Sequence, residues 1–278
     1  MTKLELGRIG VQVTPGGGAA SLDAARELEA VGYATIWLSG GPLRSLDQIR
    51  DVVAATRDVR VGSGIISVDR FDRASVAALH AELDAVQPGR FVVGLGGAHG
   101  PRPLRTLAAY LDELDTVPPT VPAGARVMAA LGPRMLQLAH DRAAGAFPFL
   151  VTPDYTARAR SQLGGDTSLV VGQLVALETD PRRARELARG PLRFLASAPA
   201  YTANIQRMGF TQDDITQLSD RLVDALVAWG DLDAIAARVS AHLRAGADQV
   251  TLSLLSPGPP DTPFPVEPLR RLATALIA

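Results

Sequence analysis

The chain contains no cysteine, and its 278 residues carry a formal net charge of only −1. Without cysteine, disulfides, thiolate metal sites and a cysteine nucleophile are excluded, and a cytoplasmic protein is favoured over a secreted disulfide scaffold. Acidic and basic residues are interspersed rather than grouped in blocks, so the charge pattern does not indicate binding to nucleic acid or to an anionic membrane. The expected partner is a small molecule.

Several sequence patterns typical of other functions are also missing. No run of about 20 apolar residues could span a membrane, and residues 1–13 lack the apolar centre of a signal peptide. The sequence has no His-Glu-x-x-His element, no series of spaced carboxylates and no Gly-x-Ser-x-Gly turn, which argues against a catalytic metal and against serine esterase chemistry. We therefore expect no metal, and we expect a bound coenzyme to supply the reactive atom.

Short apolar runs alternate with longer segments of helical period along the whole chain. This rhythm is typical of parallel strands covered by helices. A doubly wound open sheet would show the same alternation, but eight units over this length favour a closed (β/α)8 TIM barrel, which typically has about 250 residues. We predict a single barrel domain over residues 1–278. Its strands are predicted at residues 8–13, 35–39, 59–66, 91–95, 125–130, 145–149, 169–177 and 249–255.

The connections between strands add detail to this prediction. The first helix is expected over residues 21–31, ending at Gly32, and Gly246 plays the same part before the eighth strand, since glycine readily adopts the left-handed conformation that ends helices. A helical insertion is predicted at about residues 196–230, between the seventh and eighth strands. Its large side chains either cover the barrel mouth or, as is more usual for apolar residues at helical spacing, anchor the extra helices to the barrel. They are Tyr201, Met208, Phe210 and Trp229.

Catalytic residues of such barrels lie on the loops that follow the strands. The loop after the fourth predicted strand contains Gly94, Gly96, Gly97 and His99. Its glycines permit close approach of a ligand, although the pattern is not a dinucleotide-binding fingerprint. The imidazole of His99 could exchange a proton near neutral pH, or it could be an ordinary loop histidine.

Two further loops are candidates for ligand binding. Residues 129–135 run from a strand into a helix through Leu131, Gly132 and Pro133, and the free N–H groups of such a helix start form an anion site suited to phosphate. The same Gly-Pro turn is also common without a ligand. The glycines in residues 61–67 predict a bulge in the third strand, with Arg70 following it at the barrel mouth or facing solvent.

These segments resemble the luciferase-like superfamily of flavin- and deazaflavin-dependent oxidoreductases. The most specific block comprises residues 61–65, 83–91 and 94–96, and the flanking segments 24–38, 129–135, 143–146, 157–160 and 230–248 follow in the family's order. The later segments resemble an actinobacterial subgroup that depends on coenzyme F420. The arginine-rich, lysine-poor composition is also typical of high-GC bacteria, in which this deazaflavin is plentiful.

The resemblance implies a barrel with an isoalloxazine-like ring across its mouth and hydride transfer at C5 of a deazaflavin. Family members often have a non-prolyl cis peptide in the third-strand bulge behind the ring, which corresponds to Gly64-Ile65 here. The coenzyme phosphate is expected at Leu131 and Gly132, in agreement with the anion site argued from the loop itself. The resemblance also implies a homodimer. The full set of residues expected to contact the coenzyme is Ser39, Gly64, Ile65, Gly96, Gly97, Leu131 and Gly132.

The chain departs from the family pattern where the proton donor is expected. After the second strand, related deazaflavin enzymes carry an acid and a histidine, whereas this chain has Ser39-Gly40-Gly41. The acid after the fourth strand is replaced by His99, and a histidine after the sixth strand corresponds to Tyr155. His99 is therefore the candidate acid or base, with Tyr155 as a hydrogen-bond donor.

Three functions follow from these patterns. The first is an F420-dependent oxidoreductase acting on a small organic substrate. The second is an FMN-dependent luciferase-like monooxygenase. The third, suggested by the Ser39-Gly40-Gly41 replacement, is a barrel that binds a coenzyme without catalysis.

Overall fold

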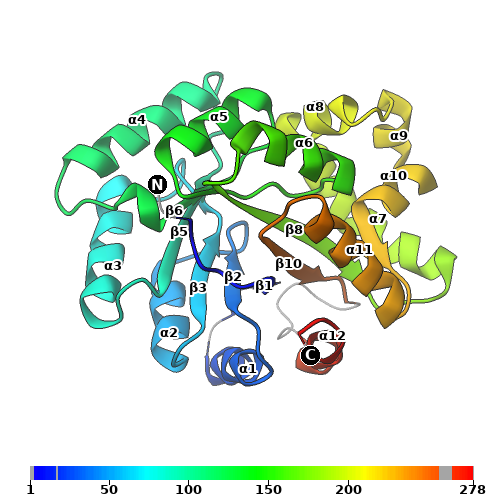
Figure 1. The fold of residues 1–278 in the computed structure, drawn as a ribbon, viewed down its shortest axis with the longest axis horizontal. Coiled ribbons are helices and arrows are strands. Elements are labelled where there is room, and N and C mark those ends of the chain that lie inside the picture. Colours follow the sequence, from blue (N-terminus) through cyan, green and yellow to red (C-terminus); the bar gives the residue numbers. More distant parts are fainter. Residues whose placement is uncertain (1–2, 17, 257–264, 278) are drawn as a thin grey trace.

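The structure is a computed structural model that describes residues 3–16, 18–256 and 265–277. Eight parallel strands form a closed barrel, because the last strand pairs with both the first and the seventh (Figure 1). The predicted TIM barrel is therefore confirmed. Its strands are β1 (Ile9–Val13), β2 (Thr35–Ser39), β3 (Arg60–Gly64), β5 (Phe91–Gly96), β6 (Arg126–Met128), β7 (Gly145–Ala146), β8 (Ser168–Ala176) and β10 (Gln249–Leu254).

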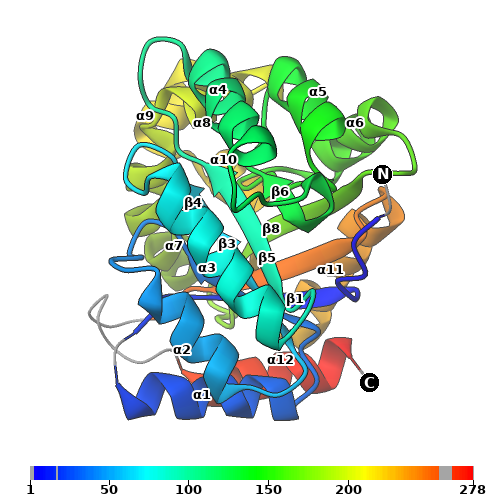
Figure 2. The same cartoon turned by 90° about the vertical axis from the view of Figure 1, so that its left-hand side faces the viewer.

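Helices surround the barrel and pack their apolar faces on the strands (Figure 2). The last helix lies between α11 and α1 and completes the ring, as both ribbon views show. The helices outside the insertion are α1 (Ala19–Ala30), α2 (Asp47–Ala55), α3 (Arg73–Val86), α4 (Pro103–Thr116), η1 (Ala123–Ala125), α5 (Pro133–Arg142), α6 (Pro153–Leu163), α7 (Pro181–Ala196), α11 (Leu232–Arg244) and α12 (Val266–Leu276).

Glycines end two of these helices as the sequence predicted. The first helix stops at Ala30, and Gly32 has a φ of +94° before the chain enters β2. After α11, Gly246 has a φ of +101° and leads into β10. Positive φ is accessible to glycine at little cost, so both turns redirect the chain within a few residues.

The predicted insertion lies between β8 and β10 and contains α8 (Pro199–Arg207), α9 (Gln212–Gln217) and α10 (Asp220–Leu226). The sequence did not predict the strand β9 (Val227–Trp229), which pairs with the C-terminal end of β8. Tyr201, Met208 and Phe210 pack into a cluster formed by α7 to α10 together with Leu150 and Leu174 of the barrel. Of the two interpretations of these aromatic and apolar residues, anchoring of the insertion is the one that the packing supports.

The barrel interior is filled by large side chains from a few strands and by glycines from others. Trp37 of β2 and Phe147 after β7 have ring centroids 4.8 Å apart. A Cβ at Gly62 would lie 2.3 Å from the Trp37 ring, and one at Gly172 would lie 2.3 Å from the ring of Phe149. The strand glycines therefore make room for aromatic rings, which is why they stand where a central strand would otherwise carry bulk.

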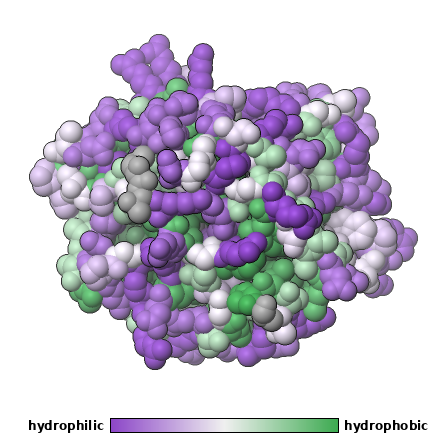
Figure 3. Space-filling view, viewed as in Figure 1, coloured by the Kyte–Doolittle hydropathy of each residue, from purple (hydrophilic) through white to green (hydrophobic). Residues whose placement is uncertain are grey.

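The surface visible in Figure 3 is mostly hydrophilic, with apolar side chains gathered near its centre. Among the described residues, no helix has the length and apolar character needed to cross a bilayer. Prolines are frequent at residues 257–268, which favours a rigid connection, but residues 257–264 lie outside the described part of the chain.

Candidate active site

A break in the third strand shapes the barrel mouth. The predicted strand 59–66 is divided into β3 and β4 (Ile66–Ser67) at Ile65, and the Gly64–Ile65 peptide is cis, as the family resemblance implied. Gly40 and Gly96 closely approach Ile65 from two sides. A Cβ at Gly40 would lie 1.6 Å from the Ile65 carbonyl oxygen, and one at Gly96 would lie 2.9 Å from Ile65 Cδ1. The mouth is thus built around this bulge.

The glycines of the mouth are needed for contacts within the protein. A Cβ at Gly94 would lie 1.8 Å from the Ser63 carbonyl oxygen, and Gly97, with a φ of +69°, approaches Ser67 in the same way. We predicted Gly96 and Gly97 as coenzyme contacts because glycine permits close approach. In the structure Gly96 closely approaches Ala129 and Ile65, and Gly97 closely approaches Ser67 of β4. Contact with a coenzyme remains a prediction for them.

Gln12 of β1 lies beside the bulge and was not found by sequence reasoning. Its Nε2 donates to the Gly64 carbonyl oxygen at 3.1 Å, while its Oε1 is buried without a hydrogen-bond partner among the described residues. A buried acceptor without a donor is costly unless a ligand or a water molecule supplies one. Gln12 Oε1 could accept a hydrogen bond from a ring that carries N–H or O–H groups and lies at the bulge. The sequence offered one signal for this residue, a polar side chain near the end of a barrel strand.

The loop after β2, which replaces the family's acid and histidine, is held by Arg70. Its guanidinium donates to the carbonyl oxygens of Gly41 at 3.0 Å and Leu43 at 2.7 Å. Of the two positions considered for Arg70, the structure therefore supports one at the mouth. Ser39 is half-buried at the end of β2, next to Gly64 in register. The described side chains place no acid–histidine pair on this loop.

The start of α5, where an anion site is predicted, has the cap geometry that such a site needs. Gly132 is the N-cap, no side chain caps the helix, and Pro133 occupies the first turn. Pro133 has no N–H, and the Met135 N–H donates to the Gly132 carbonyl oxygen at 3.0 Å, so the Arg134 N–H is the first-turn donor left to an anion at the positive end of the helix dipole. Arg207 of α8 faces the same space, since a Cβ at Gly132 would lie 3.4 Å from its Nη2 atom. The sequence did not indicate that the insertion would supply a cation here.

The bulge packs against the segment that leads to the start of α5. A Cβ at Gly96 would touch both the Ala129 Cβ, at 2.8 Å, and the Ile65 side chain. Ala129 follows β6 and precedes Leu131 and Gly132 by only a few residues.

Tyr155 lies beneath this loop. Its hydroxyl donates to the Leu131 carbonyl oxygen at 2.8 Å, and burial raises its pKa well above the usual value of a phenol. A hydroxyl has one proton to donate, so in this structure Tyr155 fixes the position of Leu131. Its predicted role as a donor to the reacting molecule is not tested by these contacts.

His99 pairs with a carboxylate that the sequence did not single out. Its Nδ1 lies 3.0 Å from Asp69 Oδ2, and its backbone N–H donates to the same oxygen at 2.8 Å. This backbone hydrogen bond is the main reason why the pKa of Asp69 is lowered. A carboxylate is only an acceptor, so Nδ1 must carry the proton and Nε2 is left to exchange one. The His99 side chain is 73% exposed, which leaves Nε2 accessible.

The other three histidines lie on the helices α3, α5 and α11. His242 is fully buried on α11, with Nε2 2.9 Å from Gln173 Oε1 and Nδ1 2.8 Å from Thr156 Oγ1. His140 bonds Thr167 Oγ1 at 2.9 Å, and His80 is buried on α3. In the described part of the chain, no group of three or more histidine, aspartate and glutamate side chains could hold a metal ion.

Comparison with known proteins agrees with this geometry. Residues 6–115 match the family model of the luciferase-like monooxygenases, which covers β1 to β5, the bulge and the His99 loop. The expected resemblance to the luciferase-like family is confirmed. No curated protein sequence matches this chain.

Solved structures with the luciferase-like barrel align over nearly the whole chain. One is the coenzyme F420-dependent tetrahydromethanopterin reductase of Methanopyrus kandleri, with 16% identity, 99% of each chain covered and a TM-score of 0.75. An F420-dependent secondary alcohol dehydrogenase aligns with 14% identity, 99% of each chain covered and a TM-score of 0.73. A third is the oxygenating constituent of 3,6-diketocamphane monooxygenase from Pseudomonas putida, solved with FMN. It aligns with 13% identity, 96% of each chain covered and a TM-score of 0.65. At these identities the likeness shows the fold.

Proposed function

We propose that this protein is an oxidoreductase that binds coenzyme F420 across the barrel mouth and catalyses hydride transfer to or from a small organic substrate. The observation that carries the proposal is the Gly64–Ile65 bulge, which packs through Gly96 against Ala129, on the segment that leads to the start of α5. Luciferase-like structures that bind F420 or FMN support a coenzyme of this class. When bound, the deazaflavin would supply the hydride chemistry.

The protein's own residues would perform three tasks. The bulge and Gln12 would support the ring, with Gln12 Oε1 accepting a hydrogen bond from it. Gly132, with the Arg134 N–H at the start of α5, would bind the phosphate, and Tyr155 would keep Leu131 in place. His99, oriented by Asp69, would exchange the substrate proton through Nε2.

A second candidate is an FMN-dependent monooxygenase, which the alignment with the FMN-bound diketocamphane monooxygenase component favours. FMN would use the same bulge and the same phosphate site. It would differ in consuming oxygen when the reduced flavin is supplied. A homodimer and a cytoplasmic location also remain predictions, and light scattering of the purified protein would test the first.

Fluorescence titration with F420 and, separately, with FMN tests the proposal. Micromolar or tighter binding of F420, followed by a change in its redox state with a substrate panel, would support it. Preference for FMN with oxygen consumption would replace it with the monooxygenase. Tight binding of a coenzyme without any redox change would indicate a non-catalytic barrel.

A further inference from the structure

A cavity of about 730 Å³ lies beside the anion site, where α4 and α5 begin and α8 passes over them. Four arginines line it: Arg102 and Arg105 from the start of α4, Arg134 from α5, and Arg207 from the insertion. Within residues 3–16, 18–256 and 265–277, no acidic side chain lines it. We refer to it as the arginine cavity.

The charges of the arginine cavity are not compensated within the described residues. Elsewhere, arginines pair with carboxylates, as Arg50 does with Glu82 at 2.7 Å and Arg185 with Asp224 at 2.7 Å. None of the four cavity arginines has an ion-pair partner in the part of the chain that the structure describes, and Arg207 has only the Asn204 side chain at 3.3 Å. Like charges held around one cavity repel each other, so an anionic ligand would be favoured there.

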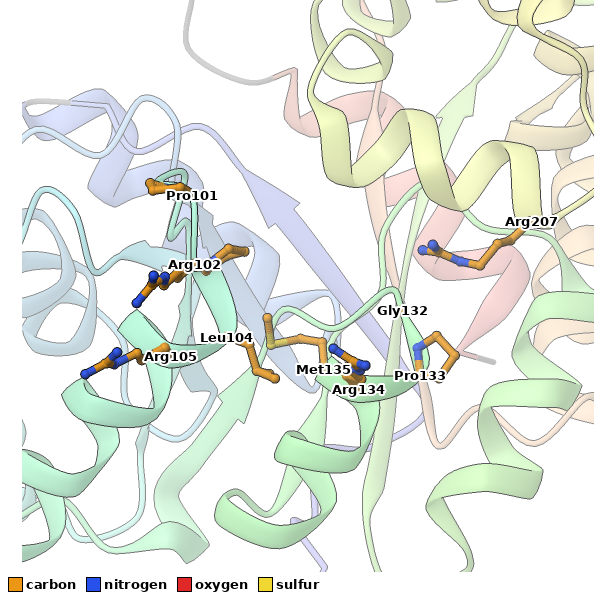
Figure 4. A pocket seen from close by; sticks show the side chains of 10 residues that line it. Pro101, Arg102, Leu104, Arg105, Gly132, Pro133, Arg134, Met135 and Arg207 are labelled. Carbon is orange, nitrogen blue, oxygen red and sulfur yellow. The ribbon is translucent and has the colours of Figure 1, made fainter.

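The guanidinium groups are spread around the cavity and do not converge on one point. Figure 4 shows Arg207 reaching towards Gly132 on one side and Arg102 and Arg105 on the opposite side. Leu104 and Met135 lie between them and provide an apolar floor. A single phosphate could touch one side only, whereas an extended ligand with several negative charges could contact both.

The helix starts reinforce this preference. Both α4 and α5 begin without a side-chain cap, at Arg102 and Gly132 respectively. The N–H groups of Leu104 and Arg105 at the first helix start, and that of Arg134 at the second, have no acceptor among the described residues. Backbone N–H groups at two helix starts favour negative charge in addition to the arginines. The ligand class indicated is therefore a chain of carboxylates that continues from a phosphate.

We propose that the arginine cavity binds the acidic tail of the coenzyme and that this contact selects F420 over FMN. The inference rests on the proposed function. F420 carries a phosphodiester followed by glutamates, whereas FMN ends in one phosphate. The start of α5 and Arg207 bind the phosphate of either coenzyme, but only the F420 tail extends to Arg102 and Arg105.

The experiment compares three ligands by fluorescence titration: F420, the deazaflavin riboside that lacks phosphate and glutamates, and FMN. The R102Q/R105Q variant should bind F420 about tenfold more weakly, and binding of the riboside and of FMN should not change. Arg207→Gln should weaken both F420 and FMN. The matched control is R182Q/R193Q, which removes two exposed charges from α7 and should leave all three affinities unchanged.

The salt dependence of the binding separates this contact from a general effect of charge. Binding of F420 to the wild type should weaken as ionic strength rises, and this dependence should be smaller in R102Q/R105Q, because screened contacts have been removed. Equal affinity of the wild type for F420 and the riboside would overturn the proposal. So would equal affinity of the wild type and R102Q/R105Q for F420.

Failure of the proposed function is distinguished by calorimetric titration with a γ-linked triglutamate peptide at low ionic strength. Binding that is lost in R102Q/R105Q would support the tail site even if no deazaflavin were turned over. If neither the peptide nor F420 bound, the tail site would be overturned together with the coenzyme assignment.

Discussion

The Nδ1 atom of His99, on the loop after β5, lies 3.0 Å from a carboxylate oxygen of Asp69, on the segment after β4. The two residues are 30 positions apart, and the pairing of β4 with β5 brings them together. This arrangement fixes which ring nitrogen carries a proton and leaves Nε2 free for the substrate.

His99→Ala should lower the turnover number about 100-fold or more while changing coenzyme affinity little, because general acid–base catalysis contributes at least this much. Asp69→Asn should lower turnover less, by about tenfold, since the imidazole remains but loses its orienting carboxylate. Steady-state kinetics and coenzyme titration of both variants measure these effects. Asp51→Asn, on the exposed face of α2, is the control. Unchanged turnover in His99→Ala would remove His99 from the mechanism.

Tyr155→Phe distinguishes a positioning role from a catalytic one. Loss of the hydroxyl leaves the Leu131 carbonyl without its 2.8 Å partner and loosens the loop before α5. We expect coenzyme affinity to fall by about fivefold to tenfold, equivalent to the loss of about 1 kcal/mol, with turnover at saturation nearly unchanged. The matched control is Tyr110→Phe on α4, which removes a hydroxyl that donates to the Phe71 carbonyl oxygen. A large fall in turnover with unchanged affinity would instead support direct action of Tyr155 on the substrate.

Gly40→Ala should destabilise the mouth because its Cβ would fall 1.6 Å from the Ile65 carbonyl oxygen. Backbone displacement of this kind costs about 1–3 kcal/mol or more in the free energy of unfolding. The neighbouring Gly41→Ala is a matched control, since no atom lies within 4 Å of its Cβ position. Urea denaturation of the two variants measures the difference. Equal stability of both would mean that the loop after β2 moves freely away from the bulge.

His242 should make stability depend on pH. Burial, and then the positive charge of Arg238, lower the pKa of His242 to about 4 from its ordinary value of 6.5. The unfolded chain therefore takes up a proton at higher pH than the folded one. Stability is complete above about pH 6.5 and falls, by on the order of 3 kcal/mol, as the pH decreases to about 4.

Thermal denaturation between pH 7 and pH 4 of the wild type and of His242→Gln measures this contribution. The variant should show a smaller decrease in this range, because the carboxylates titrate equally in both proteins. Nuclear magnetic resonance of the His242 ring should show it neutral at pH 6. A ring that titrates near pH 6.5 would contradict the buried network with Gln173 and Thr156.

Local patterns in the sequence were sufficient to predict much of the fold. Buried parallel strands are short and apolar, and helices have their own period, so the alternation indicated all eight barrel strands. Gly32 and Gly246 marked helix ends because their left-handed conformation is a local property. A bulge in the third strand was expected from glycines at positions that otherwise favour large side chains, and the strand is divided at Ile65. The strand β9 was not predicted, because a strand of three residues directly after a helix is too short to show a periodic pattern.

The site depended far more on the tertiary structure. The sequence by itself determined which side chains are available: His99 and Tyr155 after strands, Gly132 before a helix, and no cysteine at all. Only the folded barrel decided that Asp69 meets His99, that Gln12 reaches the bulge, and that Arg207 joins Arg102 on one cavity. These contacts arise because barrel closure and strand register bring the ends of distant strands to one mouth, and no local pattern encodes the distance between two loops.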